Sequence, residues 1–134
     1  MSAKSTDLGR IQEMFDVITL TKQQVASVGL TKESFINPKD DAEDLIAEGV
    51  MNRVLRITEE AGHIEENIAA QYGFDSAGAR GVRNRLAHVY GDVDREIIWQ
   101  VIEEDFDILL KACISYCDDN GIDLGVSSAA DVGL

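Results

Sequence analysis

An apolar periodicity of three and four residues is the feature that most restricts the fold of this chain, because it is the spacing of one face of an α-helix. The first segment shows it at four positions: Leu8, Ile11, Phe15 and Ile18. Thr6 or Asp7 can cap the start of this helix, and Gly29 is a typical residue just past a helix end. We therefore predict an amphipathic first helix that ends near Gly29.

The same periodicity returns after a break at Asn37-Pro38, where proline cannot supply a backbone donor. Residues 31–36 are predicted to form a short helical turn before this break. The acidic pair Asp40-Asp41 suits the start of a long second helix, which is predicted to run to about Tyr72. Its apolar stripe has seven members: Ile46, Val50, Val54, Ile57, Ala61, Ile64 and Ile68.

Two further helices are predicted in the second half of the chain. Ser76 can cap a third helix that contains Val82, Leu86 and Val89 and closes at Gly91. A fourth helix is predicted to start at Asp92-Val93-Asp94, with an apolar stripe of six residues: Ile98, Ile102, Phe106, Leu109, Cys113 and Tyr116. No segment alternates as a strand would. The predicted fold is all-α, an antiparallel four-helix bundle with a short extra helical turn.

A chain of 134 residues is long enough for one core but not for two, so we expect a single helical domain over residues 1–134. Its ends, about 1–6 and 120–134, are expected to fray. No apolar run reaches the roughly 20 residues of a membrane span, and the first residues lack the apolar region of a secretory signal. We therefore expect a cytoplasmic protein with no membrane contact. The apolar run Ile97-Ile98-Trp99 exceeds a single stripe, which favours a homodimer.

The formal net charge of −13 argues against a broad positive surface for nucleic acid, so any RNA contact must be local. Five arginines fall in two short segments: Arg53, Arg56, Arg80, Arg83 and Arg85. Cys113 and Cys117 lie four residues apart on a predicted helix, without a second cysteine pair or a nearby histidine. We expect both to be reduced packing residues rather than zinc ligands.

The octapeptide Arg-Asn-Arg-Leu-Ala-His-Val-Tyr, residues 83–90, is the strongest candidate for chemistry. The guanidinium of Arg83 can hold a phosphate, and the imidazole of His88 can move a proton near neutral pH. Asn84 lies one helical turn before His88 and can orient the imidazole or the phosphate, and Tyr90 can line the same site. Such a set suits cleavage of RNA by its own 2′-hydroxyl, which needs no metal.

The spacing of the octapeptide alone leaves a second interpretation open. Arg83 and His88 are five residues apart, which is about 140° around a regular helix, so one copy gives a loose site. Two copies facing each other across a two-fold axis would bring both residues into one shared cleft. The alternative is that the two side chains make surface hydrogen bonds near a helix end, where positive charge complements the helix dipole.

A competing pattern, Glu60-x-x-His63, has the spacing of a di-iron ligand pair on a helix. A di-iron centre needs this pair twice, and the other histidine, His88, has Arg85 at the position where a glutamate would be required. We therefore predict no metal site. The glycines also fit neither a P-loop nor a dinucleotide fingerprint.

The octapeptide and the Gly91-Asp92-Val93-Asp94 that follows it resemble the signature of the HepT-like family, the HEPN toxins of HEPN/MNT toxin–antitoxin modules. That signature is Arg-x4-His-x-Tyr ahead of a Val-Asp step. The similarity extends to Ile97-Ile98-Trp99 and Asp105-Phe106 in the fourth helix and to residues 53–61 in the second. It covers about 42–110, whereas the first helix matches only in pattern.

The resemblance implies an all-helical, dimeric, metal-independent endoribonuclease that takes no cofactor, with Arg83 and His88 catalytic in a cleft at the dimer interface. It also implies a partner, a nucleotidyltransferase-fold antitoxin of the MNT type that transfers AMP onto Tyr90. A bulky anion beside His88 would repel an RNA phosphate. The alternative function is a non-catalytic helical module that binds a nucleotide or a protein.

Overall fold

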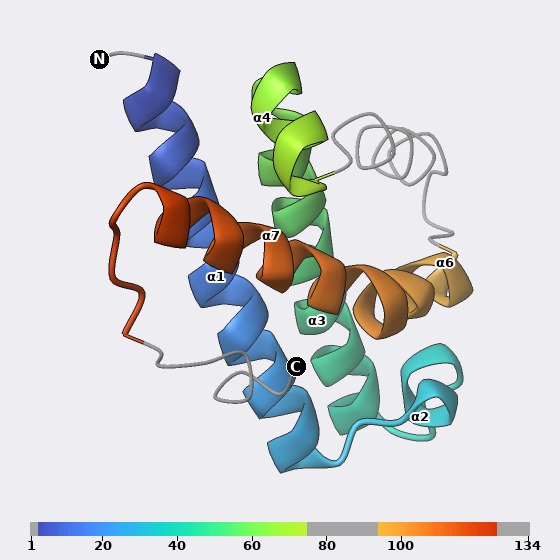
Figure 1. Cartoon of the computed structure of the whole chain (residues 1–134). Coiled ribbons are helices and arrows are strands. Elements are labelled where there is room, and N and C mark those ends of the chain that lie inside the picture. Colours follow the sequence, from blue (N-terminus) through green and yellow to red (C-terminus); the bar gives the residue numbers. More distant parts are fainter. Residues whose placement is uncertain (1–2, 75–93, 126–134) are drawn as a thin grey trace.

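The computed structural model describes residues 3–74 and 94–125, and every regular element in these two ranges is helical (Figure 1). The elements are α1 (Ala3–Val28), α2 (Lys32–Ile36), α3 (Asp41–Gly62), α4 (Glu66–Tyr72), α6 (Arg95–Gln100), a π-helical turn (Val101–Asp105) and α7 (Phe106–Asp119). The predicted all-α class and the short helical turn before Asn37-Pro38 are confirmed. The third predicted helix, 76–91, lies outside the described residues.

Helix α1 starts earlier than its sequence suggests. It begins at Ala3, and Asp7, a predicted cap, lies inside the helix with only 5% of its surface exposed. The predicted end is confirmed, because α1 stops at Val28 and Gly29 takes the left-handed conformation at φ 68°. The amide of Leu30 donates to the carbonyl oxygen of Val25 at 3.0 Å, which closes the last turn.

The predicted long second helix is wrong in one respect, since the chain breaks it into α3 and α4. His63 caps the end of α3, and Ile64 turns into the core with 2% exposure. The carboxylate of Glu65 then accepts from the amide of Ile68 at 3.3 Å and starts α4. The apolar spacing continues across this break, so periodicity alone did not reveal it; Gly62, a poor helix former, was the available signal.

The predicted fourth helix is present but contains a π-helical turn. Asp94 caps its start, as expected from the Asp92-Val93-Asp94 sequence. Val101 and Phe106 are both buried although they are five residues apart, and the amide of Phe106 donates to the carbonyl oxygen of Val101. The π turn adds one residue to the helix and thereby keeps both side chains on the core side.

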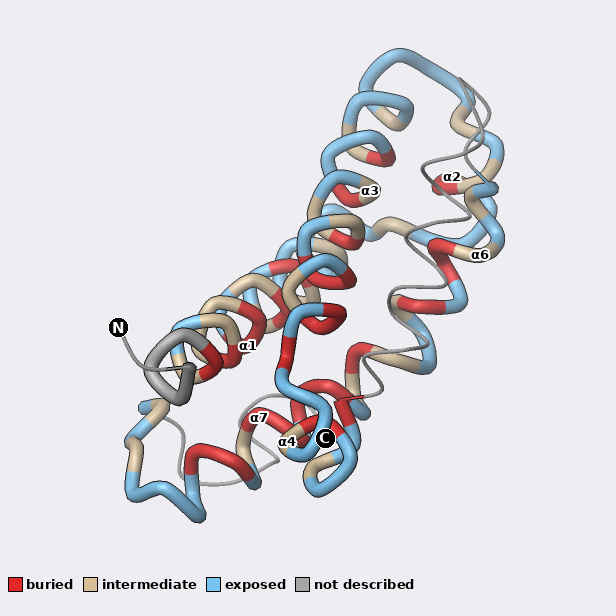
Figure 2. Tube along the Cα trace, turned by 90° about the horizontal axis from the view of Figure 1, so that it is seen from above, coloured by how far each residue is buried: buried red, intermediate tan, exposed pale blue. Residues whose placement is uncertain are grey.

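Helices α1 and α3 run antiparallel, and α7 passes across both in the view of Figure 1. Buried residues form stripes along these helices, with exposed residues on their opposite sides (Figure 2). The side chains at the centre of the core are fully or almost fully buried: Ile11, Met14, Ile18, Phe35, Val54, Ile57, Ile98, Phe106 and Leu110. One hydrophobic core therefore unites the two described ranges.

The apolar run Ile97-Ile98-Trp99, which favoured a dimer, is largely buried in the core of this one chain. Ile98 is fully buried, Trp99 is 7% exposed, and the Trp99 ring lies 5.4 Å from the ring of Phe35 in α2. Ile97 is half-buried. A second protomer is therefore not needed to explain Ile98 and Trp99. None of the helices in the described ranges is long and apolar enough to cross a membrane.

Two neighbouring positions on α7 test this account of the core. Leu110→Ala should lower the free energy of unfolding by about 2–5 kcal/mol, because Leu110 is fully buried and its loss leaves a cavity. Ile108 is 53% exposed on the same helix, so Ile108→Ala should cost less than about 1 kcal/mol. Urea unfolding followed by circular dichroism measures both. Equal losses in the two variants would contradict the burial of Leu110.

Candidate functional site

The four residues predicted to form the site are Arg83, Asn84, His88 and Tyr90, and all of them lie outside the described residues. The structure does describe the residues that flank segment 75–93 on either side. They lie at the end of α4 and at the start of α6, and their contacts fix the last described residues before the segment and the first ones after it.

The residues before the segment are fixed to α7 and to the core. Phe74, the last residue before it, is 1% exposed. The hydroxyl of Tyr72 donates to the carboxylate of Asp119 at 2.9 Å, and the Tyr72 ring lies edge-on to Tyr116 with centroids 5.3 Å apart. Gly73 ends α4 at φ 88°, a conformation that favours glycine, and so turns the chain toward the core.

The residues after the segment are fixed to α2 and α3. The carboxylate of Asp94 accepts from the amides of Glu96 and Ile97 at 3.0 and 3.3 Å. Arg95 then donates to two acceptors, the carbonyl oxygen of Phe35 at 2.8 Å and a carboxylate oxygen of Asp44 at 3.0 Å. Its guanidinium carbon also lies 5.9 Å from the centre of the Phe35 ring. One side chain thus joins three helices.

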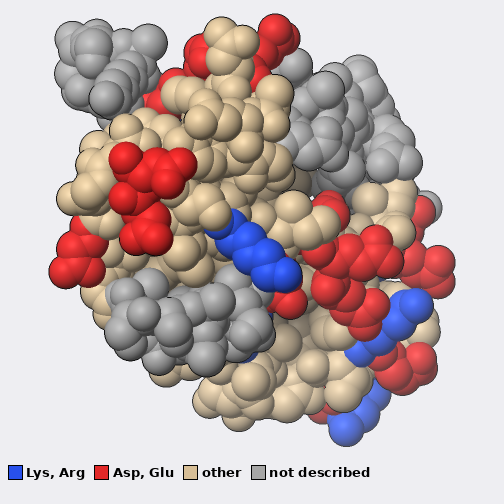
Figure 3. Space-filling view, in the orientation of Figure 1, with Lys and Arg blue, Asp and Glu red and all other residues tan. Residues whose placement is uncertain are grey.

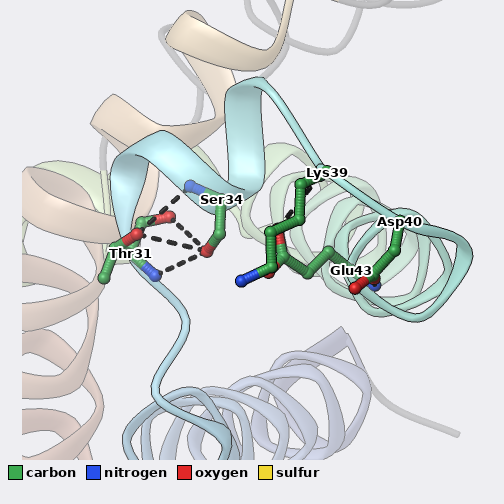
Figure 4. A network of polar contacts seen from close by, with 5 residues as sticks. All are labelled: Thr31, Ser34, Lys39, Asp40 and Glu43. Atoms are coloured by element: carbon green, nitrogen blue, oxygen red, sulfur yellow. Dashed lines mark hydrogen bonds and ion pairs between the residues drawn. The ribbon is translucent and has the colours of Figure 1, made fainter.

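Both helices that accept from Arg95 are themselves capped (Figure 4). In α2, Thr31 accepts from the amide of Ser34 at 3.1 Å, and the hydroxyl oxygen of Ser34 accepts from the amide of Thr31 at 3.0 Å. In α3, a carboxylate oxygen of Asp40 accepts from the amide of Glu43 at 2.9 Å, while Lys39 pairs with Glu43 at 3.3 Å. These caps fix the first turns of α2 and α3.

Most basic side chains of the described part are engaged by carboxylates. Five ion pairs occur there: Arg10–Glu60, Lys22–Asp107, Lys39–Glu43, Arg56–Glu13 and Arg95–Asp44. Arg53 donates to Gln24. The face in Figure 3 carries several groups of acidic side chains and few basic ones. Segment 75–93 differs in composition, with three arginines and two aspartates in a chain that has 12 basic and 25 acidic residues.

The alternative metal ligands do not form a cluster. Glu60 lies on α3 and pairs with Arg10 of α1 at 3.1 Å, and His63 is exposed at the end of α3. Within residues 3–74 and 94–125, no group of three potential ligands among His, Cys, Asp and Glu lies close enough to hold a metal ion. Glu60 thus serves an ion pair between α1 and α3 in the described part of the chain.

Two tyrosines of the described part are held in their protonated form. The hydrogen bond to Asp119 is the main cause that raises the pKa of Tyr72, and burial is the main cause that raises the pKa of Tyr116. Tyr116 is only 3% exposed. Neither phenol is a ready nucleophile, because each pKa lies above its ordinary value and the phenolate is disfavoured.

Arg95 is a residue that the sequence analysis missed, because none of the patterns included it. Its acceptors lie 60 and 51 residues away in the sequence, at Phe35 and Asp44. No local signal marks such a contact. The same holds for Tyr72 and Asp119, which are 47 residues apart.

The model of one protein family, described as Ribonuclease HepT-like, matches residues 30–115, which is more than half of the chain. The chain belongs to the HepT-like ribonuclease family. The match contains the whole octapeptide and every described helix from α2 to α6, together with most of α7. Helix α1 lies outside it, in agreement with the weaker resemblance of the first helix. Searches of curated proteins and of solved structures gave no match.

The cysteines of this HepT-like chain are buried and free, as packing residues would be. Burial raises the pKa of both Cys113 and Cys117, and the thiol of Cys113 donates to the carbonyl oxygen of Ile11 at 3.5 Å. A thiol with a raised pKa is a weak nucleophile, because the thiolate is the reactive form. Neither cysteine is therefore suited to nucleophilic catalysis.

This assignment predicts the alkylation behaviour of the two thiols. In the native protein at pH 8, iodoacetamide should leave Cys113 and Cys117 unmodified, because both are buried and their pKa values are raised. The same treatment in urea should alkylate both. Mass spectrometry of the intact protein counts the added groups. Rapid modification of the native protein would show that at least one thiol is accessible as thiolate.

Proposed function

We propose that this HepT-like chain is the toxin of a HEPN/MNT toxin–antitoxin pair and acts as a metal-independent endoribonuclease in the cytoplasm. Arg83 and His88 are the proposed catalytic residues. Asn84 orients the imidazole or the RNA phosphate, and Tyr90 lines the same site. The observation that carries this proposal is the match to a ribonuclease family over a region that includes the whole octapeptide.

The proposed reaction is attack by a ribose 2′-oxygen on the adjacent phosphorus. A bond forms between phosphorus and the 2′-oxygen, and the bond from phosphorus to the 5′-oxygen breaks. His88 carries out one of the two proton transfers, either taking the proton from the 2′-hydroxyl or giving one to the leaving 5′-oxygen, and a water molecule carries out the other. Arg83 stabilises the negative charge of the transition state. The products are a 2′,3′-cyclic phosphate and a 5′-hydroxyl. Apart from water, the reaction uses only groups of the RNA and of this chain.

We further propose that the active form is a homodimer. The reason is the spacing of about 140° between Arg83 and His88 in a regular helix, which two facing copies would compensate in one shared cleft. In the described part of the molecule, most basic side chains pair with carboxylates and are therefore less available to RNA phosphates. This supports the proposal that RNA binds at a local site elsewhere in the chain. RNA phosphates are therefore proposed to bind at segment 75–93.

We propose that a nucleotidyltransferase antitoxin silences the enzyme through AMP transfer to Tyr90. The Tyr90 oxygen attacks the α-phosphorus of ATP, pyrophosphate leaves, and the phenolic proton is lost. The states of the two other tyrosines support this choice of acceptor. Tyr116 is 3% exposed, and the hydroxyl of Tyr72 is engaged by Asp119. An AMP group beside His88 would repel an RNA phosphate through like charge.

Two substitutions test the catalytic assignment. Arg83→Ala and His88→Ala should each reduce RNA cleavage by at least about 100-fold, because each removes a group that acts in the transition state. Cleavage by purified protein in excess EDTA, with analysis of the product ends, measures the effect, and melting temperature and gel filtration serve as controls. Full activity in either variant would overturn its catalytic role, and loss of wild-type activity in EDTA would overturn metal independence.

A second experiment tests the switch. The cognate nucleotidyltransferase with ATP and magnesium should add one AMP group to Tyr90 and stop RNA cleavage. Tyr90→Phe should stay unmodified and active under the same conditions. Peptide mass spectrometry locates the group. AMP on Tyr72 or Tyr116, or an unmodified protein, would contradict the proposed acceptor.

A further inference from the structure

Arg95 lies close in sequence to the proposed catalytic segment. It is the second described residue after segment 75–93, and only four residues separate it from Tyr90. Its two hydrogen bonds, to the carbonyl oxygen of Phe35 and to Asp44, are made to two helices that precede segment 75–93 in the sequence. The position of the first turn of α6 is therefore defined relative to α2 and α3 rather than by α6 alone.

The rest of α6 is held in place by other contacts. Ile98 is fully buried, and Trp99 packs against Phe35 with ring centroids 5.4 Å apart. These two side chains lie near the end of the helix that leads into the π-helical turn. They hold α6 in the fold, whereas Arg95 and the cap at Asp94 set the orientation of its first turn.

The two acceptors of Arg95 lie in well-fixed helices and can therefore define the position of the first turn of α6. Phe35 is fully buried, and its carbonyl oxygen lies in α2, which has a complete capping box at Thr31 and Ser34. Asp44 directly follows Glu43, which bonds to both Asp40 and Lys39 in the first turn of α3 (Figure 4). Arg95 therefore donates to two groups in helices whose first turns are fixed by their own caps.

A guanidinium is required for this arrangement. Its planar fork presents donors on separate nitrogens, and here Nη1 bonds to Phe35 while Nη2 bonds to Asp44. The ammonium of a lysine is a single point charge on a flexible chain and cannot reproduce both contacts with the same geometry. The ion pair itself contributes little stability, because the carboxylate of Asp44 is half-exposed.

We propose that Arg95 is a positioning residue of the ribonuclease: its bonds to Phe35 and Asp44 fix the start of α6, the first described helix after the proposed catalytic segment. This inference rests on the proposed function of that segment. A misplacement of about 1 Å can lower the rate of a reaction that depends on alignment by about 100-fold. Loss of the Arg95 contacts therefore lowers kcat, while RNA affinity and global stability change little.

The test compares Arg95→Lys and Asp44→Asn with a matched control, Asp107→Asn. Asp107 also lies in the first turn of a helix, is about as exposed as Asp44, and accepts an ion pair from another helix, from Lys22 at 2.6 Å. Arg95→Lys and Asp44→Asn should lower kcat about tenfold and leave KM within about twofold. Asp107→Asn should keep the wild-type kcat. All three should show similar small losses of melting temperature.

The same series includes the wild type, Arg83→Ala and His88→Ala, so two failures can be told apart. If the wild type cleaves RNA, the two catalytic variants do not, and Arg95→Lys keeps full kcat, the positioning role is overturned and the proposed function stands. An equal loss of kcat in Asp107→Asn also overturns it. If the wild type itself does not cleave RNA, the proposed function falls and the positioning role falls with it.

Discussion

The rest of the structure depends on the burial of one face of α1 against α3 and α7. Ile11, Met14 and Ile18 are fully buried, and the hydroxyl of the buried Thr21 donates to the carbonyl oxygen of Val17 at 2.6 Å. Burial of each large aliphatic side chain contributes about 1.5–3 kcal/mol. Helices α2, α4 and α6 are too short to be stable in isolation and take their positions from this packing. The family match begins after α1, yet the matched region folds around it.

The periodicity of the sequence predicted the helical class well, because a core stripe leaves a regular pattern. It could not predict where a helix breaks when the pattern continues through the break, as at His63–Glu65, where Ile64 stays in register with Ala61. The π-helical turn was missed for a related reason. The sequence spacing suits Ile102 and Phe106, whereas the chain buries Val101 and leaves Ile102 half-buried. Both features depend on the packing of distant helices, which a local pattern does not contain.

The candidate site also has a part that the sequence reveals and a part that it does not. The order of Arg83, Asn84, His88 and Tyr90 is visible in the sequence and led to a family that the family model confirms. The residues that hold both sides of the segment, Tyr72 with Asp119 and Arg95 with Asp44, carry no local signal, because each contact joins positions about 50 residues apart. A motif can therefore suggest candidate reacting groups, whereas the contacts on either side of the segment emerge only from the fold.

An acidic chain that is proposed to cleave RNA must confine its available positive charge to a small region. The described ion pairs contribute to this, since Arg10, Arg56 and Lys22 each join α1 to α3 or to α7 and so serve helix packing. Few phosphate contacts then remain for binding, and each contributes only about 0.7 to the slope of log affinity against log salt for single strands. Repulsion by the other carboxylates acts in the opposite direction and grows as salt falls, because the Debye length rises to about 30 Å at 0.01 M. The two effects oppose each other, so the proposed enzyme gains little from nonspecific attraction. In the proposed mechanism, the choice of RNA would then rest on the fit of one phosphate and its neighbours at the proposed site.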